Sequence, residues 1–188
     1  MKLCKEVMAL KYEAINELAN FDYHDALINK IDFQGQGERM IWEVSNINAL
    51  TWNSQNPFDE NMCIGDAVMI FEDAYIESIV YGGYTVYDEN NIVIESEEPK
   101  TALPEEYYDI LKSVVTIREG NSFIESTEIF DLDLFTVLDD GRYKARFDTK
   151  FFITIIFSKS IIKWDDFSGK AWYARDEWKA QVKEHEKS

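Results

Sequence analysis

Apolar and polar residues alternate with a period of two through much of the chain after Ala26. The clearest case is 142–147, where Tyr143, Ala145 and Phe147 alternate with three cations. Successive side chains of a β-strand point to opposite faces of a sheet, so this pattern predicts a strand with one buried and one charged face. Residues 151–157 are almost continuously apolar, which predicts a strand covered on both faces.

Turn-forming residues separate these runs at spacings typical of hairpins. They stand at Gln34–Gly37, at Gly82-Gly83, which we expect to join 79–81 to 84–87 directly, and at Asp140-Gly141. Strands and helices do not alternate regularly, which argues against a doubly wound parallel sheet. The pattern predicts an α+β fold that is mainly antiparallel β, either a sandwich or an open barrel.

Helical spacing of apolar residues occurs near both ends of the chain. Over residues 3–20, apolar residues recur three or four positions apart, and Trp178 and Val182 do so within 174–186. We therefore expect an N-terminal and a C-terminal helix. A shorter helix is expected over Glu105–Lys112, after Pro104.

The chain is expected to form a single domain, 1–188, in two sheet-rich halves. The one candidate internal boundary is the segment near 98–105, which contains two prolines. A weak internal echo supports related sheet units, because an Asp-Ala-x-Ile-x-x-Ile pattern begins at Asp25 and again at Asp73. Chance similarity between strands is the alternative explanation, and we leave the choice open.

The overall charge is strongly negative. The 188 residues include 36 Asp and Glu against 19 Lys and Arg, a net charge of −17. Nucleic acids and anionic lipids bind through cationic side chains, so we expect neither as a partner. No apolar run has the length of a membrane span and the first residues lack the apolar core of a signal peptide, which predicts a cytoplasmic protein.

The negative charge is unevenly distributed along the chain. Neither Lys nor Arg occurs between Arg39 and Lys100, and this Lys-free span carries −12 of the net −17, which leaves −5 elsewhere. One interpretation is general solubility. The other is an acidic face that steers a basic protein partner, with tyrosines as anchors. The candidate partner-binding residues are Asp66, Glu72, Asp73, Tyr75, Glu77, Tyr84, Tyr87, Asp88 and Glu89.

Evidence for catalysis is thin in the sequence. The alternative to a binding protein is a metal- or carboxylate-dependent hydrolase in which His24 acts with Asp22 and Asp25. A second nearby His or Cys is missing from the sequence, so we expect no metal site and no cofactor. Cys4 and Cys63 form no metal-binding motif. The oligomeric state stays open.

Three short segments resemble features of small bacterial proteins. Phe21–Phe33, FDYHDALINKIDF, resembles a His-Asp-small-x-Ile strand that opens a sheet-rich domain, and Ala67–Ile79 and Phe167–Tyr173 fit the same resemblance. Some of those proteins are grouped with immunity proteins that neutralise secreted toxins. The resemblance implies a non-enzymatic binding role, and a basic toxin as partner would suit the acidic Lys-free span.

Overall fold

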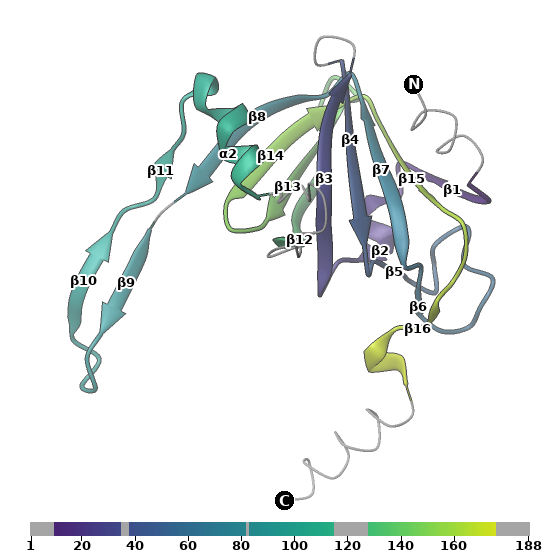
Figure 1. Ribbon diagram of the computed structural model, residues 1–188, viewed down its shortest axis with the longest axis horizontal. Coiled ribbons are helices and arrows are strands. Elements are labelled where there is room, and N and C mark those ends of the chain that lie inside the picture. Colours follow the sequence, from purple (N-terminus) through teal and green to yellow (C-terminus); the bar gives the residue numbers. More distant parts are fainter. Residues whose placement is uncertain (1–9, 35–37, 82, 115–127, 176–188) are drawn as a thin grey trace, which may run out of the picture.

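The computed structural model describes residues 10–34, 38–81, 83–114 and 128–175, and strands dominate them (Figure 1). The strands are β1 (Tyr12–Ile15), β2 (Phe21–Asp22), β3 (Ala26–Gln34), β4 (Arg39–Ser45), β5 (Asn48–Ala49), β6 (Met62–Cys63), β7 (Asp66–Glu72), β8 (Tyr75–Tyr81), β9 (Tyr84–Tyr87), β10 (Val93–Glu97), β11 (Lys100–Thr101), β12 (Glu128–Val137), β13 (Tyr143–Asp148), β14 (Phe152–Phe157), β15 (Lys159–Trp164) and β16 (Gly169–Lys170). The helices are η1 (Leu18–Asn20), η3 (Pro104–Glu106), α2 (Tyr107–Val114) and η4 (Trp172–Ala174).

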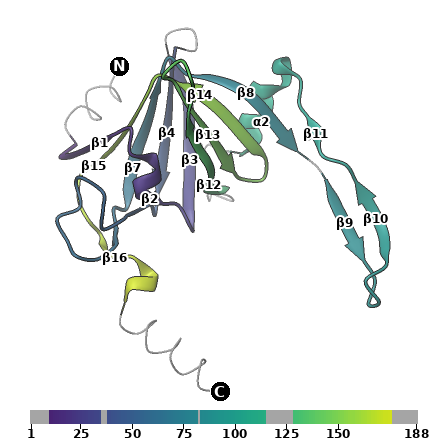
Figure 2. The ribbon, with the colours of Figure 1, turned by 180° about the vertical axis from the view of Figure 1, so that it is seen from behind.

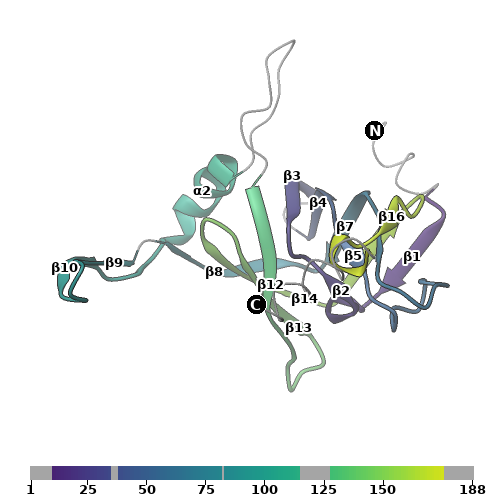
Figure 3. The same cartoon turned by 90° about the horizontal axis from the view of Figure 1, so that it is seen from below.

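One antiparallel sheet of ten strands organises the molecule, in the order β1-β15-β7-β4-β3-β12-β13-β14-β8-β11. β12 joins its two halves, because Glu128–Phe130 pairs with β3 and the residues from Asp131 onward pair with β13. Seen from below, β12 stands between the half that ends at β1 and the half that contains β8 (Figure 3). The predicted antiparallel β class is confirmed, and among the described strands the sheet is open rather than closed.

The two halves enclose an aromatic core. The ring of Trp42, on β4, lies 4.8 to 6.0 Å from those of Phe71, Phe130 and Phe147, which come from both halves. All four side chains are at most 1% exposed. Burial of an aromatic side chain removes about 150–250 Å² from water, which at about 25 cal/mol per Å² stabilises the fold by several kcal/mol per ring. This cluster therefore fixes the halves against each other.

The chain crosses between the halves at two adjacent turns. β7 leads into β8 through Asp73, which has a φ of 49°, and β14 leads into β15 through Ser158. The Ser158 amide donates to the Glu72 carbonyl at 2.9 Å, and the Ser158 hydroxyl donates to the Asp73 carboxylate at 2.6 Å. Hydrogen bonds thus join the two crossings to each other.

The predicted N-terminal helix over 3–20 is not supported, because the described part of that range holds a strand and only the three-residue helix η1. Residues 12–15 form β1, which pairs with β15, and Tyr12 stacks on Trp164 at 5.4 Å. Tyr12 and Ala14 face the core while Glu13 faces outward, so the segment also has the period of a strand. The edge of the sheet satisfies the backbone of this segment, which decides between the two periods. Residues 3–9 lie outside the described part.

The predicted C-terminal helix also finds no support. Ala174 ends the short helix η4, and Arg175 has extended backbone angles. The remainder of that prediction lies outside the described residues. The internal helix expected over Glu105–Lys112 is confirmed in substance, because η3 and α2 together cover 104–114.

Two of the three predicted turns join the strands that the sequence assigned to them. β3 pairs with β4, and β12 pairs with β13 around Asp140-Gly141. The prediction for Gly82-Gly83 is wrong, because β8 and β9 do not pair with each other. β8 pairs with β14 and β11, and β9 pairs with β10, so the turn lies further along, after Asp88.

Candidate functional site

A hairpin arm projects from the body of the molecule. It consists of β9 and β10, residues 84–97, which pair with each other and with no other described strand. Figures 1 and 2 show the arm extending beyond β8 and β11, away from the ten-stranded sheet. Every residue of its two strands is exposed, so these strands add nothing to the described core.

Gly83 and Pro99 form the junction between the arm and the body. The backbone of Gly83 has a φ of +89°, in the region that favours glycine. A Cβ at this position would lie 2.7 Å from Cγ of Pro99. The close approach of these two residues fixes the direction in which the arm leaves β8.

The two faces of the arm differ in chemistry. The register pairs Tyr84 with Glu97 and Thr85 with Ser96, with a bulge between Val93 and Glu95. Side-chain alternation then places Tyr84, Val86, Glu95 and Glu97 on one face and Thr85, Tyr87, Val93 and Ser96 on the other. The Tyr84 hydroxyl donates to the Glu95 carboxylate, which raises the pKa of Tyr84. One face is therefore acidic and the other uncharged.

Asp88 closes the turn at the tip of the arm. Its amide donates to the Ile92 carbonyl at 2.9 Å, and its carboxylate accepts the amides of Asn90 and Ile92 at 2.8 and 2.9 Å. The bonds from Ile92 and Asn90 hold the pKa of Asp88 below its ordinary value. The turn is therefore tightest when Asp88 is ionised.

The acidic residues of the Lys-free span divide between the body and the arm. In the body, cations from outside the span pair with Glu43 (Lys30, 3.3 Å), Glu60 (Lys170, 2.7 Å), Glu72 (Lys159, 3.8 Å) and Glu77 (Lys144, 2.6 Å). The arm and its base hold Asp88, Glu89, Glu95, Glu97 and Glu98. Lys100, which contacts Glu97, is the only cation paired with any of these five among the described residues. Within the described residues, the arm and its base therefore group four carboxylates without a cation partner on one projecting element, while Asp59, Asp66 and Asp73 lack such a partner at separate places on the body.

The candidate partner-binding residues do not form one surface. Tyr84, Tyr87, Asp88 and Glu89 lie together on β9 and its turn, whereas the other five lie on the body. Glu72 and Asp73 stand at the β7–β8 crossing, Tyr75 and Glu77 follow on β8, and Asp66 is at the far end of β7. Six residue steps of about 3.3 Å along the strand separate Asp66 from Glu72 by roughly 20 Å. The structure brings only the first four together.

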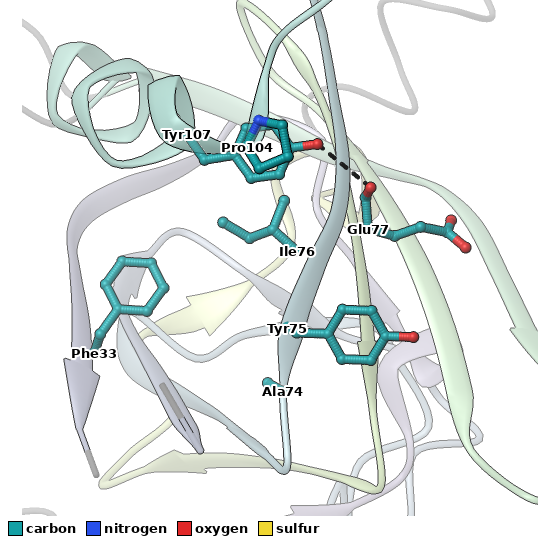
Figure 4. A pocket seen from close by; sticks show the side chains of 7 residues that line it. All are labelled: Phe33, Ala74, Tyr75, Ile76, Glu77, Pro104 and Tyr107. Carbon is teal, nitrogen blue, oxygen red and sulfur yellow. Dashed lines mark hydrogen bonds between the residues drawn. The ribbon is translucent and has the colours of Figure 1, made fainter. Parts of the chain in front are cut away.

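Tyr75 and Glu77 border a cavity of about 380 Å³ beside α2. Figure 4 shows its lining, which is Phe33, Ala74, Tyr75, Ile76, Glu77, Pro104 and Tyr107. The Tyr107 hydroxyl donates to the Glu77 carbonyl at 3.4 Å, and Arg142 lies 5.7 Å from the centre of the Tyr75 ring. The Glu77 carboxylate lies 2.6 Å from Lys144, so contacts within the fold already engage both candidate side chains.

The three residues of the alternative catalytic site lie at the turn between β2 and β3. The side chains of His24 and Asp25 are 63% and 61% exposed, with Nε2 and Oδ2 3.9 Å apart. The carboxylate of Asp22 accepts the His24 amide at 3.1 Å and the Asn48 side chain at 3.3 Å. Asp22 thus points into a polar network, while the other two side chains face solvent.

Asp22 also borders a second cavity, of about 370 Å³. The lining residues are Ala19, Phe21, Asp22, Tyr23, Asp131, Leu132 and Phe135, so His24 is not among them. The buried Tyr23 hydroxyl donates to the Leu18 carbonyl at 3.0 Å. Burial, followed by the charges of Asp131 and Asp22, raises the pKa of Tyr23 well above its ordinary value. Tyr23 is therefore neutral at physiological pH.

The described residues give little evidence for other classes of site. Within them, no group of three His, Cys, Asp or Glu side chains is placed to hold a metal ion. None of the helices described has the length and apolar character needed to cross a membrane. No family model, curated protein or solved structure matches the chain. The functional argument therefore depends on the geometry of this chain itself.

Sequence reasoning missed the second strand of the arm as a candidate surface. Ile92, Val93 and Ile94 are 63%, 52% and 67% exposed, the most apolar stretch of the arm. A signal was available, because these three consecutive β-branched residues lead directly into Glu95 and the acidic run after it. A continuous apolar run by itself also fits a buried strand, so only the exposure seen in the structure makes this segment a candidate binding surface.

Proposed function

We propose that this protein binds a basic protein partner and that the arm is its main contact surface. The observation that carries the proposal is an exposed hairpin with carboxylates and large apolar side chains but no cation within 84–97. Its large exposed apolar residues are Tyr84, Val86, Tyr87, Ile92, Val93 and Ile94. Large apolar side chains left exposed together on one projecting element typically mark an interaction site.

The two kinds of side chain serve different steps of binding. Tyrosine buries a large area with few rotatable bonds, so Tyr84 and Tyr87 suit the role of anchors. The arm carboxylates attract a basic partner before contact and accelerate association. In the body, by contrast, Glu43, Glu72 and Glu77 are paired with lysines of the same chain. The resemblance to immunity proteins supports the same kind of partner.

The hydrolase alternative has less support. His24 and Asp25 face solvent, and His24 does not line the cavity that Asp22 borders. General acid–base chemistry needs groups within hydrogen-bonding reach of one substrate position. A binding role asks only for the exposed arm, so it is the function that the geometry favours.

An arm-shortened variant tests the proposal, with a short turn joining Gly83 to Glu98 in place of 84–97. Lysate of the source organism is passed over the immobilised protein, each retained protein is identified, and its affinity is measured with purified components. We expect a basic partner that binds the unmodified protein and loses binding to the arm-shortened variant.

Single substitutions locate the contact. Tyr87 and Tyr108 are 56% and 57% exposed, but Tyr87 is on the arm and Tyr108 on α2. Tyr87→Ala should weaken binding of the partner by about 1–3 kcal/mol, the cost of losing an interface anchor. Tyr108→Ala should weaken binding by less than about 0.5 kcal/mol. Partners that bind the arm-shortened variant as tightly as the unmodified protein would refute the proposal.

A further inference from the structure

The arm is a two-stranded sheet with two outer edges, and none of the described strands pairs with either. The two edges differ in how well they resist pairing. The β10 edge contains a bulge, two glutamates within the strand, and then Glu98 and Pro99. Bulges, charges and proline are the features by which proteins block strand addition.

β9 has none of these protections. Its sequence, Tyr84-Thr85-Val86-Tyr87, contains only aromatic and β-branched residues, which favour extended structure, and its register to β10 lacks any irregularity on the β9 side. The edge is exposed along its whole length. β9 therefore presents backbone donors and acceptors that an extended peptide can use.

The positions of these backbone groups follow from the turn. The Asp88 amide donates across the hairpin to Ile92, and backbone groups alternate in direction along an antiparallel strand. Val86 therefore bonds toward β10, while Thr85 and Tyr87 direct their amides and carbonyls outward. Ser96, which faces Thr85 in the register, has the equivalent outward position on the β10 edge.

We propose that an extended, basic segment of the partner adds to β9 as a third strand of the arm. The inference depends on the proposed function and specifies how the partner is held. Alternate side chains of an added strand would lie on the two faces of the arm. On the acidic face the added side chains would lie beside Tyr84 and Val86 of β9, from where lysines are long enough to extend toward Glu95 and Glu97 on β10. On the other face, apolar residues would lie beside Tyr87.

Charge favours this occupant over a second copy of the chain. Two β9 strands pairing edge to edge would join two arms that are each acidic and hold no cation within 84–97, with the carboxylates of β10 on the outer strands of the joined sheet. Such pairing brings two negatively charged arms together and supplies no opposite charge, whereas a basic segment supplies one. A segment in which lysine and apolar residues alternate complements both faces at once.

The experiment uses a short blocked peptide of alternating lysine and valine as the probe, with the full-length protein. Thr85→Pro removes an outward amide from the β9 edge, and Ser96→Pro removes the paired outward amide from the β10 edge, so each is the control for the other. Thr85→Pro should weaken peptide binding by about tenfold or more, and Ser96→Pro by less than about twofold. A peptide with the same composition but lysines and valines in separate blocks should bind about tenfold more weakly to the unmodified protein.

Amide hydrogen exchange in the unmodified protein supplies a readout that does not depend on how the proline variants fold. Bound peptide should slow exchange at Thr85 and Tyr87 but not at Ser96. Equal protection of both edges, equal weakening by both prolines, or no preference for the alternating peptide would overturn strand addition. A change in mass on light scattering without peptide would instead indicate pairing between copies and would also overturn it. None of these results affects capture of a basic protein by the arm, which the arm-shortened variant tests separately.

Discussion

At the scale of single residues, two tryptophans differ in how much they contribute to the free energy of unfolding, because one is buried and the other is exposed. Trp42 is fully buried among rings from both halves of the sheet, whereas Trp52 is 65% exposed. Trp42→Ala should lower the free energy of unfolding by about 3–5 kcal/mol, because it leaves a large cavity in the core. Trp52→Ala should lower it by less than about 0.5 kcal/mol. Urea unfolding measures both, and similar losses for the two would contradict the assignment of the core.

The ionisation of Asp88 makes the stability of the arm turn depend on pH. Because amides of Ile92 and Asn90 hold its pKa below the ordinary value, ionised Asp88 stabilises the folded turn. This contribution is complete above the unfolded pKa, about 3.9, and is lost as pH falls through the lower folded value. Carbon-detected NMR titration should show Asp88 ionising at lower pH in the native protein than in urea. The same midpoint in both states would contradict the turn geometry.

The repeated Asp-Ala pattern has a local structural meaning. Asp25 and Asp73 both have positive φ, at 66° and 49°, and each precedes a buried alanine at the start of a strand. Aspartate tolerates this conformation better than most residues. The echo therefore encodes two similar turns, which sequence comparison within the chain could detect without knowing the sheet.

At the scale of elements, the junction at Gly83 controls where the arm points. Gly83 and Gly141 both have positive φ, but a Cβ would meet Pro99 at Gly83 and nothing within 4 Å at Gly141. Gly141→Ala should cost about 1–2 kcal/mol from backbone strain alone. Gly83→Ala should in addition displace the arm, seen as NMR shift changes across 84–97. Adding Pro99→Ala to Gly83→Ala should reverse part of those shifts, and unchanged arm shifts in Gly83→Ala would refute the contact.

The arm and the body should behave as separable elements. The strands of the arm are wholly exposed and pair only with each other. The arm-shortened variant should therefore keep the free energy of unfolding of the unmodified protein within about 1 kcal/mol, since no described core contact is lost. Calorimetry checks this, and a loss of several kcal/mol would mean that the arm supports the fold.

At the scale of the whole molecule, charge distribution should control association with the partner. The arm and its base group five carboxylates on one projecting element, so we expect the arm to lead the long-range attraction of a basic partner. The association rate should fall between about 50 and 500 mM salt, because screening shortens the reach of exposed charges. Glu95→Gln with Glu97→Gln should reduce the rate and its salt dependence, and Glu72→Gln should change neither. Equal effects of the double substitution in the arm and of Glu72→Gln on the association rate would refute steering by the arm.

Local patterns in the sequence determined several parts of this fold. Alternation predicted β13, and a continuous apolar run predicted β14, which is buried from Ile153 to Phe157. Turn residues predicted the β3–β4 and β12–β13 hairpins, because side-chain period and turn chemistry act over a few neighbouring residues. The Lys-free span and the tyrosines of β9 were visible in the same way. These features need no knowledge of distant contacts.

Tertiary structure decided the rest. Residues 12–15 have both helical and strand periods, and pairing with β15 selected the strand. Gly82-Gly83 has the composition of a tight turn, yet pairing of β8 with β14 and of β9 with β10 carries the chain through it. Only folding brought lysines from distant segments to Glu43, Glu60, Glu72 and Glu77 of the body, while the arm received no cation from a distant segment within the described residues. Pairing between distant strands and charges depends on which surfaces meet, and a linear pattern does not contain that information.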